Sequence, residues 1–141
     1  MKILRFNFEN KKLFDQAFLL RTKVFIEEQG IHPDLEYENE KDAIHYLLFV
    51  GEKAVATGRW RQMPDGIKLE RFVTLKNYRG KGYGLMILQH ILKEVIPLNL
   101  PIYLNAQTSA LGFYKKSGFF ESGKPFEEAG IEHYKMFFKH P

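Results

Sequence analysis

A glycine-rich turn is the part of this sequence where residue types and spacing point most directly to chemistry. In Arg79-Gly80-Lys81-Gly82-Tyr83-Gly84, three glycines alternate with larger residues, between a strand-like segment and the apolar stripe of a helix. Glycine lets backbone amides approach a ligand closely. Amides that converge at a helix N-terminus favour phosphate or pyrophosphate. Arg79 and Lys81 add positive charge, so the turn predicts an anion-binding site.

Other known motifs fit this turn less well. A P-loop needs Lys followed by Ser or Thr, and a dinucleotide-binding loop needs a third glycine where this sequence has Leu85. Lys81-Gly82-Tyr83-Gly84 does match the first four residues of the RNP1 motif of RNA-binding proteins. RNP1 lies on a strand and uses aromatic residues, whereas Leu85 and Leu88 follow here with helical spacing. RNA binding is therefore the second interpretation.

Hydrophobic periodicity predicts the elements that position this turn. It predicts strands at residues 2–8, 43–50, 54–62, 67–75 and 101–107, and a final pair of strands from Gly118-Phe119 to Phe138. Helical spacing predicts helices at residues 13–30, 85–95 and 109–116, and the acidic stretch 31–42 is expected to form a loop. This order predicts a mixed α/β domain in which helices cover one sheet.

Length and composition agree with a single domain over residues 1–141. The chain is 45% hydrophobic and 15% aromatic, which is enough to build a core, and its net charge of +4 suits an anionic partner. It has no cysteine, which excludes disulfides and a covalent cysteine intermediate and favours a reducing cytoplasm. We see no signal peptide and no apolar stretch long enough to span a membrane.

Several segments together resemble the GNAT superfamily of N-acetyltransferases. The turn has the form Q/R-x-x-G-x-G/A of the superfamily's acetyl-CoA pyrophosphate loop. It is flanked by further matching segments: Glu70-Arg71-Phe72-Val73-Thr74, Leu104-Asn105-Ala106-Gln107 and Phe113-Tyr114-Lys115-Lys116-Ser117-Gly118-Phe119. The remaining matches resemble the small bacterial ElaA-like subgroup: Arg21-x-x-Val24-Phe25-Ile26-x-Glu28-Gln29, His45 and Gly130-Ile131-x-His133. In combination these segments cover nearly the whole chain in the superfamily's order.

The resemblance implies a fold and a cofactor site. The expected fold is the GNAT acyl-CoA N-acyltransferase fold, a central and mostly antiparallel sheet that splays between its fourth and fifth strands and is flanked by helices. Acetyl-CoA is the implied acetyl donor, with pantetheine in the splay and the pyrophosphate on the turn. The implied cofactor-binding residues are Phe72, Val73, Thr74, Arg79, Gly80, Lys81, Gly82, Tyr83, Gly84, Leu85, Asn105, Gln107, Phe113 and Lys116. Gln107 stands where the family usually has Asn, and strand alternation puts Asn105 on the same face.

The resemblance also assigns a catalytic acid. Tyr114 matches the family's general acid, which protonates or hydrogen-bonds the thiolate that leaves when an amine attacks acetyl-CoA directly. From its position alone, Tyr114 would be read as a core aromatic next to Phe113. The general base is left open between Glu70, His45, His133 and a water chain. Glu70 is equally well interpreted as a salt-bridged strand residue, with Arg59 or Lys68 as its partner.

The sequence therefore predicts an acetyl-CoA-dependent N-acetyltransferase that acetylates a primary amine in a ternary complex. Its acceptor is a small molecule, a protein or a peptide, and no metal, nucleic acid or membrane partner is expected. A CoA-binding domain without catalysis is a further interpretation, and a homodimer is left open. An acidic cluster is interpreted either as an entrance for a polyamine or amino sugar or as a solvated loop; it comprises Asp34, Glu36, Glu38, Glu40 and Asp42.

Overall fold

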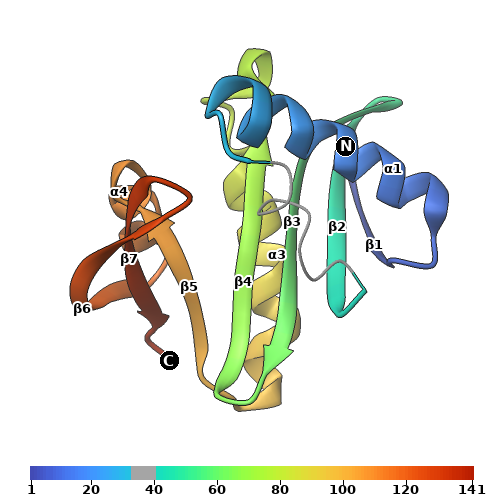
Figure 1. Cartoon of the computed structure of the whole chain (residues 1–141). Coiled ribbons are helices and arrows are strands. Elements are labelled where there is room, and N and C mark those ends of the chain that lie inside the picture. Colours follow the sequence, from blue (N-terminus) through green and yellow to red (C-terminus); the bar gives the residue numbers. More distant parts are fainter. Residues whose placement is uncertain (33–40) are drawn as a thin grey trace.

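The fold is built on a single β-sheet. In the computed structural model, which describes residues 1–32 and 41–141, seven strands form one mixed sheet in the order β1-β2-β3-β4-β5-β7-β6 (Figure 1). The strands are β1 (Lys2–Asn7), β2 (Ala43–Val50), β3 (Lys53–Met63), β4 (Gly66–Thr74), β5 (Ile102–Gln107), β6 (Phe119–Glu128) and β7 (Ile131–Phe138). All neighbouring strands pair antiparallel except β4 and β5, which are parallel. The predicted mixed α/β fold with a mostly antiparallel sheet is confirmed.

Helices join the strands. The α-helices are α1 (Lys11–Arg21), α3 (Tyr83–Val95) and α4 (Leu111–Lys116). A π-helical segment, η1 (Thr22–Glu28), continues α1, and short 3₁₀ turns lie at η2 (Lys76–Tyr78), η3 (Ile96–Leu98) and η4 (Thr108–Ala110). The segment 13–30, which the sequence predicts as a single helix, is therefore an α-helix followed by a π-helix. Its start is fixed by Asn10, whose Oδ1 accepts a hydrogen bond from the Leu13 amide at 3.2 Å.

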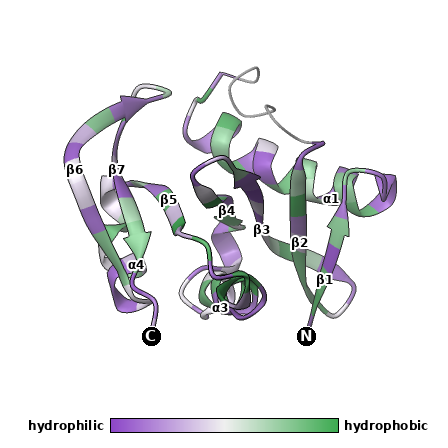
Figure 2. Cartoon of the chain, turned by 90° about the horizontal axis from the view of Figure 1, so that it is seen from below, coloured by the Kyte–Doolittle hydropathy of each residue, from purple (hydrophilic) through white to green (hydrophobic). Residues whose placement is uncertain are grey.

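Two apolar layers lie on opposite faces of the sheet, one under α1 and one under α3 (Figure 2). The α3 layer contains the helix stripe that includes Ile87 and Ile91, together with Leu69 of β4, Leu104 of β5 and Met136 of β7. Because side chains alternate along a strand, the neighbours of these three strand residues face the opposite side. This alternation decides which polar side chains share a face at the site.

The sheet opens between β4 and β5. Their pairing is limited to Ile67↔Ile102, Lys68↔Tyr103 and Leu69↔Leu104, and beyond this point β5 diverges from β4 (Figure 1). The edge of β4 from Glu70 to Thr74 therefore has no hydrogen-bonded partner strand in β5. Backbone donors and acceptors along such an edge can pair with an extended ligand.

A β-bulge lies in β4 at the point where the two strands separate. In the ladder with β3, Thr57 pairs with Val73 but Arg59 pairs with Glu70, so Arg71 and Phe72 together face Gly58. Position 58 requires glycine, because the Cβ of any other residue would lie 2.7 Å from the Phe72 ring, closer than van der Waals contact allows. Arg71 has φ +60°, a conformation that costs a non-glycine residue about 1 kcal/mol or more.

Candidate active site

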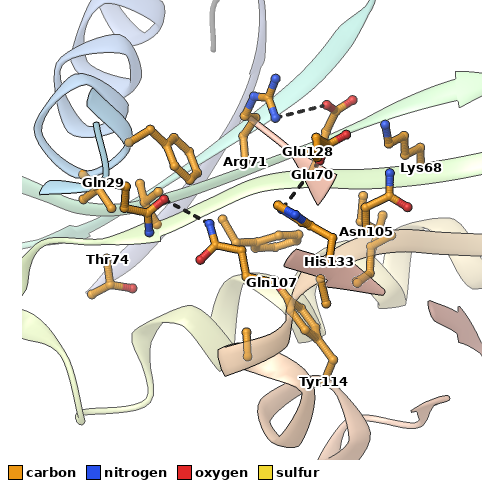
Figure 3. A pocket seen from close by; sticks show the side chains of 18 of the residues that line it. Gln29, Lys68, Glu70, Arg71, Thr74, Asn105, Gln107, Tyr114, Glu128 and His133 are labelled. Atoms are coloured by element: carbon orange, nitrogen blue, oxygen red, sulfur yellow. Dashed lines mark hydrogen bonds and ion pairs between the residues drawn. The ribbon is translucent and has the colours of Figure 1, made fainter. Parts of the chain in front are cut away.

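A cleft of about 290 Å³ occupies the opening between β4 and β5 (Figure 3). The π-helical segment contributes Phe25 and Glu28 to its wall, and β4 and β5 contribute the residues on either side of the opening. Of the predicted site residues, the structure brings together Glu70, Phe72, Val73, Thr74, Arg79, Asn105, Gln107, Tyr114 and His133 in this lining.

The glycine-rich turn lies next to the cleft and begins α3. Gly82 is the N-cap in a left-handed conformation (φ +83°), and the first helical amide with a backbone partner is that of Met86, bonded to the Gly82 carbonyl at 3.0 Å. The amides of Tyr83, Gly84 and Leu85 therefore have no partner within the helix. Because Lys81-Gly82-Tyr83-Gly84 begins a helix rather than lying on a strand, it lacks the placement that an RNP1 motif requires.

Two polar contacts join the π-helical region to the rest of the cleft. Arg79 donates to the Thr74 carbonyl at 2.9 Å and to the Glu28 carboxylate at 2.7 Å. The amide nitrogen of Gln107 donates to Gln29 Oε1 at 3.0 Å (Figure 3). A π-helix has hydrogen bonds between residues five apart, whereas those of an α-helix join residues four apart. The Gln29 amide accordingly donates to the Val24 carbonyl, five residues earlier. This local change of helix type positions Glu28 and Gln29 at the cleft.

Tyr114 reaches the cleft from α4. Its ring packs edge-on against Phe72, Phe113 and Phe119, with centroids 6.2, 5.1 and 6.0 Å away, and its hydroxyl makes no hydrogen bond with any described residue. Burial raises the pKa of Tyr114 well above its ordinary value of 10. The hydroxyl is therefore protonated throughout the neutral range and can donate a hydrogen bond.

His133 reaches the cleft from β7 and has a defined tautomer. Its Nδ1 lies 2.6 Å from the Ile131 carbonyl oxygen, which can only accept, so Nδ1 carries the proton and Nε2 of the neutral ring has a free lone pair. Nε2 lies 3.6 Å from a Glu128 carboxylate oxygen (Figure 3). His45, the other candidate histidine, is 1% exposed between Phe6 and Phe14 and lies outside the cleft lining.

Glu70 is held in a buried ion-pair network. Its carboxylate accepts from Arg59 Nη2 at 3.1 Å and from Arg61 Nε in a very short contact. Burial alone would raise its pKa, but the charge of Arg59, the hydrogen bond from Arg61 and the charges of Lys68 and Arg71 outweigh burial and lower the pKa from 4.5 to about 2. A carboxylate with that pKa is a weak proton acceptor. The geometry favours the salt-bridge interpretation of Glu70, with Arg59 as the expected partner and Arg61 as a second one.

The first prediction follows from this network. Glu70→Gln keeps the shape of the side chain but leaves two buried arginines without their counter-charge, so we expect a loss of about 3–5 kcal/mol in unfolding free energy. Because the folded-state pKa is depressed, wild-type stability should also fall as pH drops from about 4.5 towards 2, by roughly 3 kcal/mol. The variant should lack that acid-dependent component. Urea unfolding at several pH values measures both effects.

A surface pair provides the matched control. Lys11 and Asp15 form an exposed ion pair at 2.9 Å, and Asp15→Asn should cost less than about 1 kcal/mol. Equal losses in the two variants would show that the Glu70 network does not stabilise the fold.

The remaining predicted residues lie at the edge of the site. Phe113 is 38% exposed on α4, next to Tyr114, and Lys116 is exposed at the end of α4. The turn residues Gly80 to Leu85 lie outside the cleft lining itself. The sequence did not predict Lys68, Arg71 and Glu128 as site residues, because strand register rather than a local motif brings them together. Asp34, Glu36, Glu38 and Glu40 lie outside the described residues, and Asp42 is exposed.

Two further findings concern residues 1–32 and 41–141 only. Within these ranges, no group of three or more His, Asp or Glu side chains is placed to hold a metal ion. None of the helices in the same part of the chain is long and apolar enough to cross a membrane.

Comparison with known proteins identifies the family. Residues 15–139 match the acetyltransferase (GNAT) domain family. An uncharacterized N-acetyltransferase, YjcF of Bacillus subtilis, is 39% identical over 132 residues, covering 91% of this chain and 94% of the relative. The crystal structure of Escherichia coli ElaA superposes with a TM-score of 0.89 at 21% identity, over 99% of this chain and 100% of that one. An aminoglycoside 6′-N-acetyltransferase complexed with coenzyme A superposes with a TM-score of 0.77 at 18% identity, over 97% of this chain and 96% of that one. The chain therefore belongs to the GNAT acetyltransferases, a family that transfers an acyl group from coenzyme A to an amine, and within this family to the ElaA-like group.

Proposed function

We propose that residues 1–141 form one N-acetyltransferase domain that transfers acetyl from acetyl-CoA to a primary amine by direct attack in a ternary complex. The observation that carries the proposal is the placement of His133 and Tyr114 on opposite faces of the opening between β4 and β5. The cysteine-free sequence supports both direct transfer and a reducing compartment such as the cytoplasm.

Strand register supports this placement. His133 pairs with Gln107 in the β5–β7 ladder, and both alternate with residues of the α3 layer, so they face away from α3. Tyr114 packs against the α3 layer, on the other side of the sheet. A thioester placed between β4 and β5 would thus have a proton acceptor on one face and a hydrogen-bond donor on the other. The amine can then lose its proton on one face while the departing thiolate is stabilised from the other.

Each residue then has a definable task. The neutral Nε2 of His133 takes a proton from the attacking amine, and the nearby Glu128 carboxylate stabilises the imidazolium that results. Tyr114 donates a hydrogen bond to the developing thiolate. The pKa of a tyrosine is already above that of a thiol, and burial raises the pKa of Tyr114 further, so donation of a hydrogen bond rather than complete proton transfer is the favoured role. We propose that Glu70 is a positioning residue that fixes β4.

The cofactor would be held by backbone groups. Pantetheine would lie along the free edge of β4 at Phe72, Val73 and Thr74, and one of these amides would polarise the thioester carbonyl. The amides of Gly80 to Leu85 would hold the pyrophosphate at the start of α3. A structural neighbour with this fold is complexed with coenzyme A, which supports coenzyme A as the ligand class.

A second prediction tests the turn. Acetyl-CoA at a hundredfold excess over its dissociation constant should stabilise the wild type by about 2.7 kcal/mol, or roughly 5–10 °C in Tm. Gly82→Val should lose most of this shift, because φ +83° is strained for valine and the side chain occupies space beside the free amides. Thermal unfolding with and without acetyl-CoA measures this shift in Tm for both proteins.

Gly51 gives the matched control. It has φ +62° in the β2–β3 turn, and a Cβ added to it would meet no atom within 4 Å, as at Gly82. Gly51→Val should lose similar intrinsic stability but keep the acetyl-CoA shift. If both variants keep the shift, the turn does not bind the cofactor.

Turnover is tested by incubating the protein with acetyl-CoA and a panel of amines and following free CoA. Acceptor-dependent release of CoA supports the enzyme. Binding of acetyl-CoA without release for any amine would support the non-catalytic CoA-binding interpretation. Steeply salt-dependent RNA affinity would favour the RNA-binding one.

A further inference from the structure

An exposed ion pair joins the π-helical segment to the start of the glycine-rich turn. Glu28 is the last residue of η1, Arg79 directly precedes Gly80, and both line the cleft. Glu28 Oε2 lies 2.7 Å from Arg79 Nη2, and the two side chains remain 35% and 44% exposed. Exposed ion pairs contribute little to folding stability. The main consequence of this pair is therefore the orientation that it gives to the guanidinium.

The Arg79 guanidinium is held along one of its two binding edges. Nε donates to the Thr74 carbonyl at 2.9 Å, and Nη2, on the same side of the group, donates to Glu28. The other edge, formed by Nη1 and the second hydrogen of Nη2, makes no hydrogen bond or ion pair with residues 1–32 or 41–141. Two parallel N–H groups on such an edge fit the oxygens of a phosphate.

Thr74 places this guanidinium next to the start of α3. A Cβ added to Gly84 would lie 3.5 Å from Thr74 Oγ1, so the end of β4 is in contact with the first turn of the helix. The amides of Tyr83, Gly84 and Leu85 have no partner within the helix. The free edge of Arg79 and these amides therefore lie at the same end of the cleft.

The π-helix and β5 together fix the position of Glu28. The amide of the next residue, Gln29, donates to the Val24 carbonyl at 3.1 Å, which closes the end of the π-helix. The Gln29 side chain accepts a hydrogen bond from Gln107 at 3.0 Å, across the cleft (Figure 3). The carboxylate that holds Arg79 is thus carried by a segment with contacts of its own to β5.

We propose that Glu28 is a positioning residue for the cofactor, which holds the Arg79 guanidinium so that its free edge binds the diphosphate at the turn. This inference rests on the proposed function. An arginine that is ordered before the cofactor arrives loses less conformational entropy on binding. Without this effect, the carboxylate would only repel the diphosphate. Positioning therefore predicts that Glu28 strengthens acetyl-CoA binding, whereas simple repulsion predicts that it weakens binding.

The sign of the effect is measured by isothermal titration calorimetry with acetyl-CoA. Glu28→Ala should weaken binding by about three- to tenfold, although it removes a negative charge. Glu28→Gln keeps an oxygen that can accept from Nη2, so its affinity should lie closer to the wild type than to Glu28→Ala. The other charged side chains of the lining and the turn are the same in every variant, so the comparison isolates Glu28.

A double-mutant cycle tests whether Glu28 acts through Arg79. Arg79→Gln should weaken acetyl-CoA binding by about ten- to hundredfold. Adding Glu28→Ala to Arg79→Gln should cause no further loss, because the group that Glu28 positions is already gone. With an acceptor in hand, Glu28→Ala should also lower kcat/KM more for acetyl-CoA than for S-acetylpantetheine, which has no diphosphate, and mainly through KM.

Glu121 gives the matched control. Its carboxylate lies 3.1 Å from Lys115 Nζ, with side chains 35% and 50% exposed, and neither residue lines the cleft. Glu121→Ala removes an ion pair of similar exposure, so its Tm should change about as much as that of Glu28→Ala. It should keep the wild-type affinity for acetyl-CoA.

The outcomes distinguish the inference from the proposed function. Acetyl-CoA binding that is unchanged or stronger in Glu28→Ala would overturn the inference and leave the acetyltransferase standing. A further loss on adding Glu28→Ala to Arg79→Gln would do the same, because Glu28 would then act independently of Arg79. Failure of the wild type to bind acetyl-CoA would overturn the proposed function, and the inference with it.

Discussion

Tyr114→Phe should lower kcat by about a hundredfold or more while leaving acetyl-CoA affinity nearly unchanged. The ring and its contacts with Phe72, Phe113 and Phe119 remain, so the binding site is preserved. The lost hydroxyl would strengthen its hydrogen bond only as negative charge develops on the sulfur, so the loss falls on the chemical step. Single-turnover kinetics and acetyl-CoA titration measure the two quantities.

Tyr103→Phe is the control for removing a buried hydroxyl. Tyr103 donates to Asp65 at 2.8 Å and lies outside the cleft lining, so its loss should affect stability but not the rate. If Tyr114→Phe turns over within a few-fold of the wild type while chemistry is rate-limiting, Tyr114 has a packing role only.

His133→Gln should lower kcat/KM by about a hundred- to ten-thousandfold, because the amide cannot take the proton from the attacking amine. Measuring kcat/KM and the free energy of unfolding for both proteins tests the role. A structural histidine would lower the free energy of unfolding without lowering kcat/KM of the folded protein to this extent.

His90 provides a matched control. It lies on α3 with Nε2 3.6 Å from a Glu94 carboxylate oxygen, the same separation that joins His133 to Glu128, but it is outside the cleft. His90→Gln should retain the wild-type kcat/KM. Equal losses in the two variants would contradict the assignment of His133.

The sequence predicts much of the fold because most elements have local signals. Strand β2 has the predicted bounds, and the apolar stripe of α3 follows the glycine-rich turn as expected. The π-helix was not predicted, since the apolar stripe that begins in α1 continues through residues 22–28 and carries no mark of the change in helix type. The resemblance implies a bulge that splays the fourth strand from the fifth, but the position of the bulge has no local signal, because it depends on a contact between Gly58 and Phe72 on neighbouring strands.

The candidate site likewise contains residues that a sequence motif predicts and residues that only the fold brings together. Segments with a motif, such as the turn and Tyr114, are readable along the chain. Lys68, Arg71 and Glu128 have no motif, and only the sheet order places them beside His133. Glu70 could be read as a base or as an ion-pair partner until the register with β3 placed Arg59 opposite it.

The fate of the acetyl group tests the proposed transfer most directly. Acetyl-CoA with an isotopically labelled acetyl group is incubated with the protein and the acceptor that releases the most CoA, and the products are identified by mass spectrometry. Direct transfer predicts one labelled N-acetyl amine for each CoA released, with no acetylated protein intermediate. Labelled acetate in place of an acetylated amine, or CoA release that does not depend on the acceptor, would contradict it.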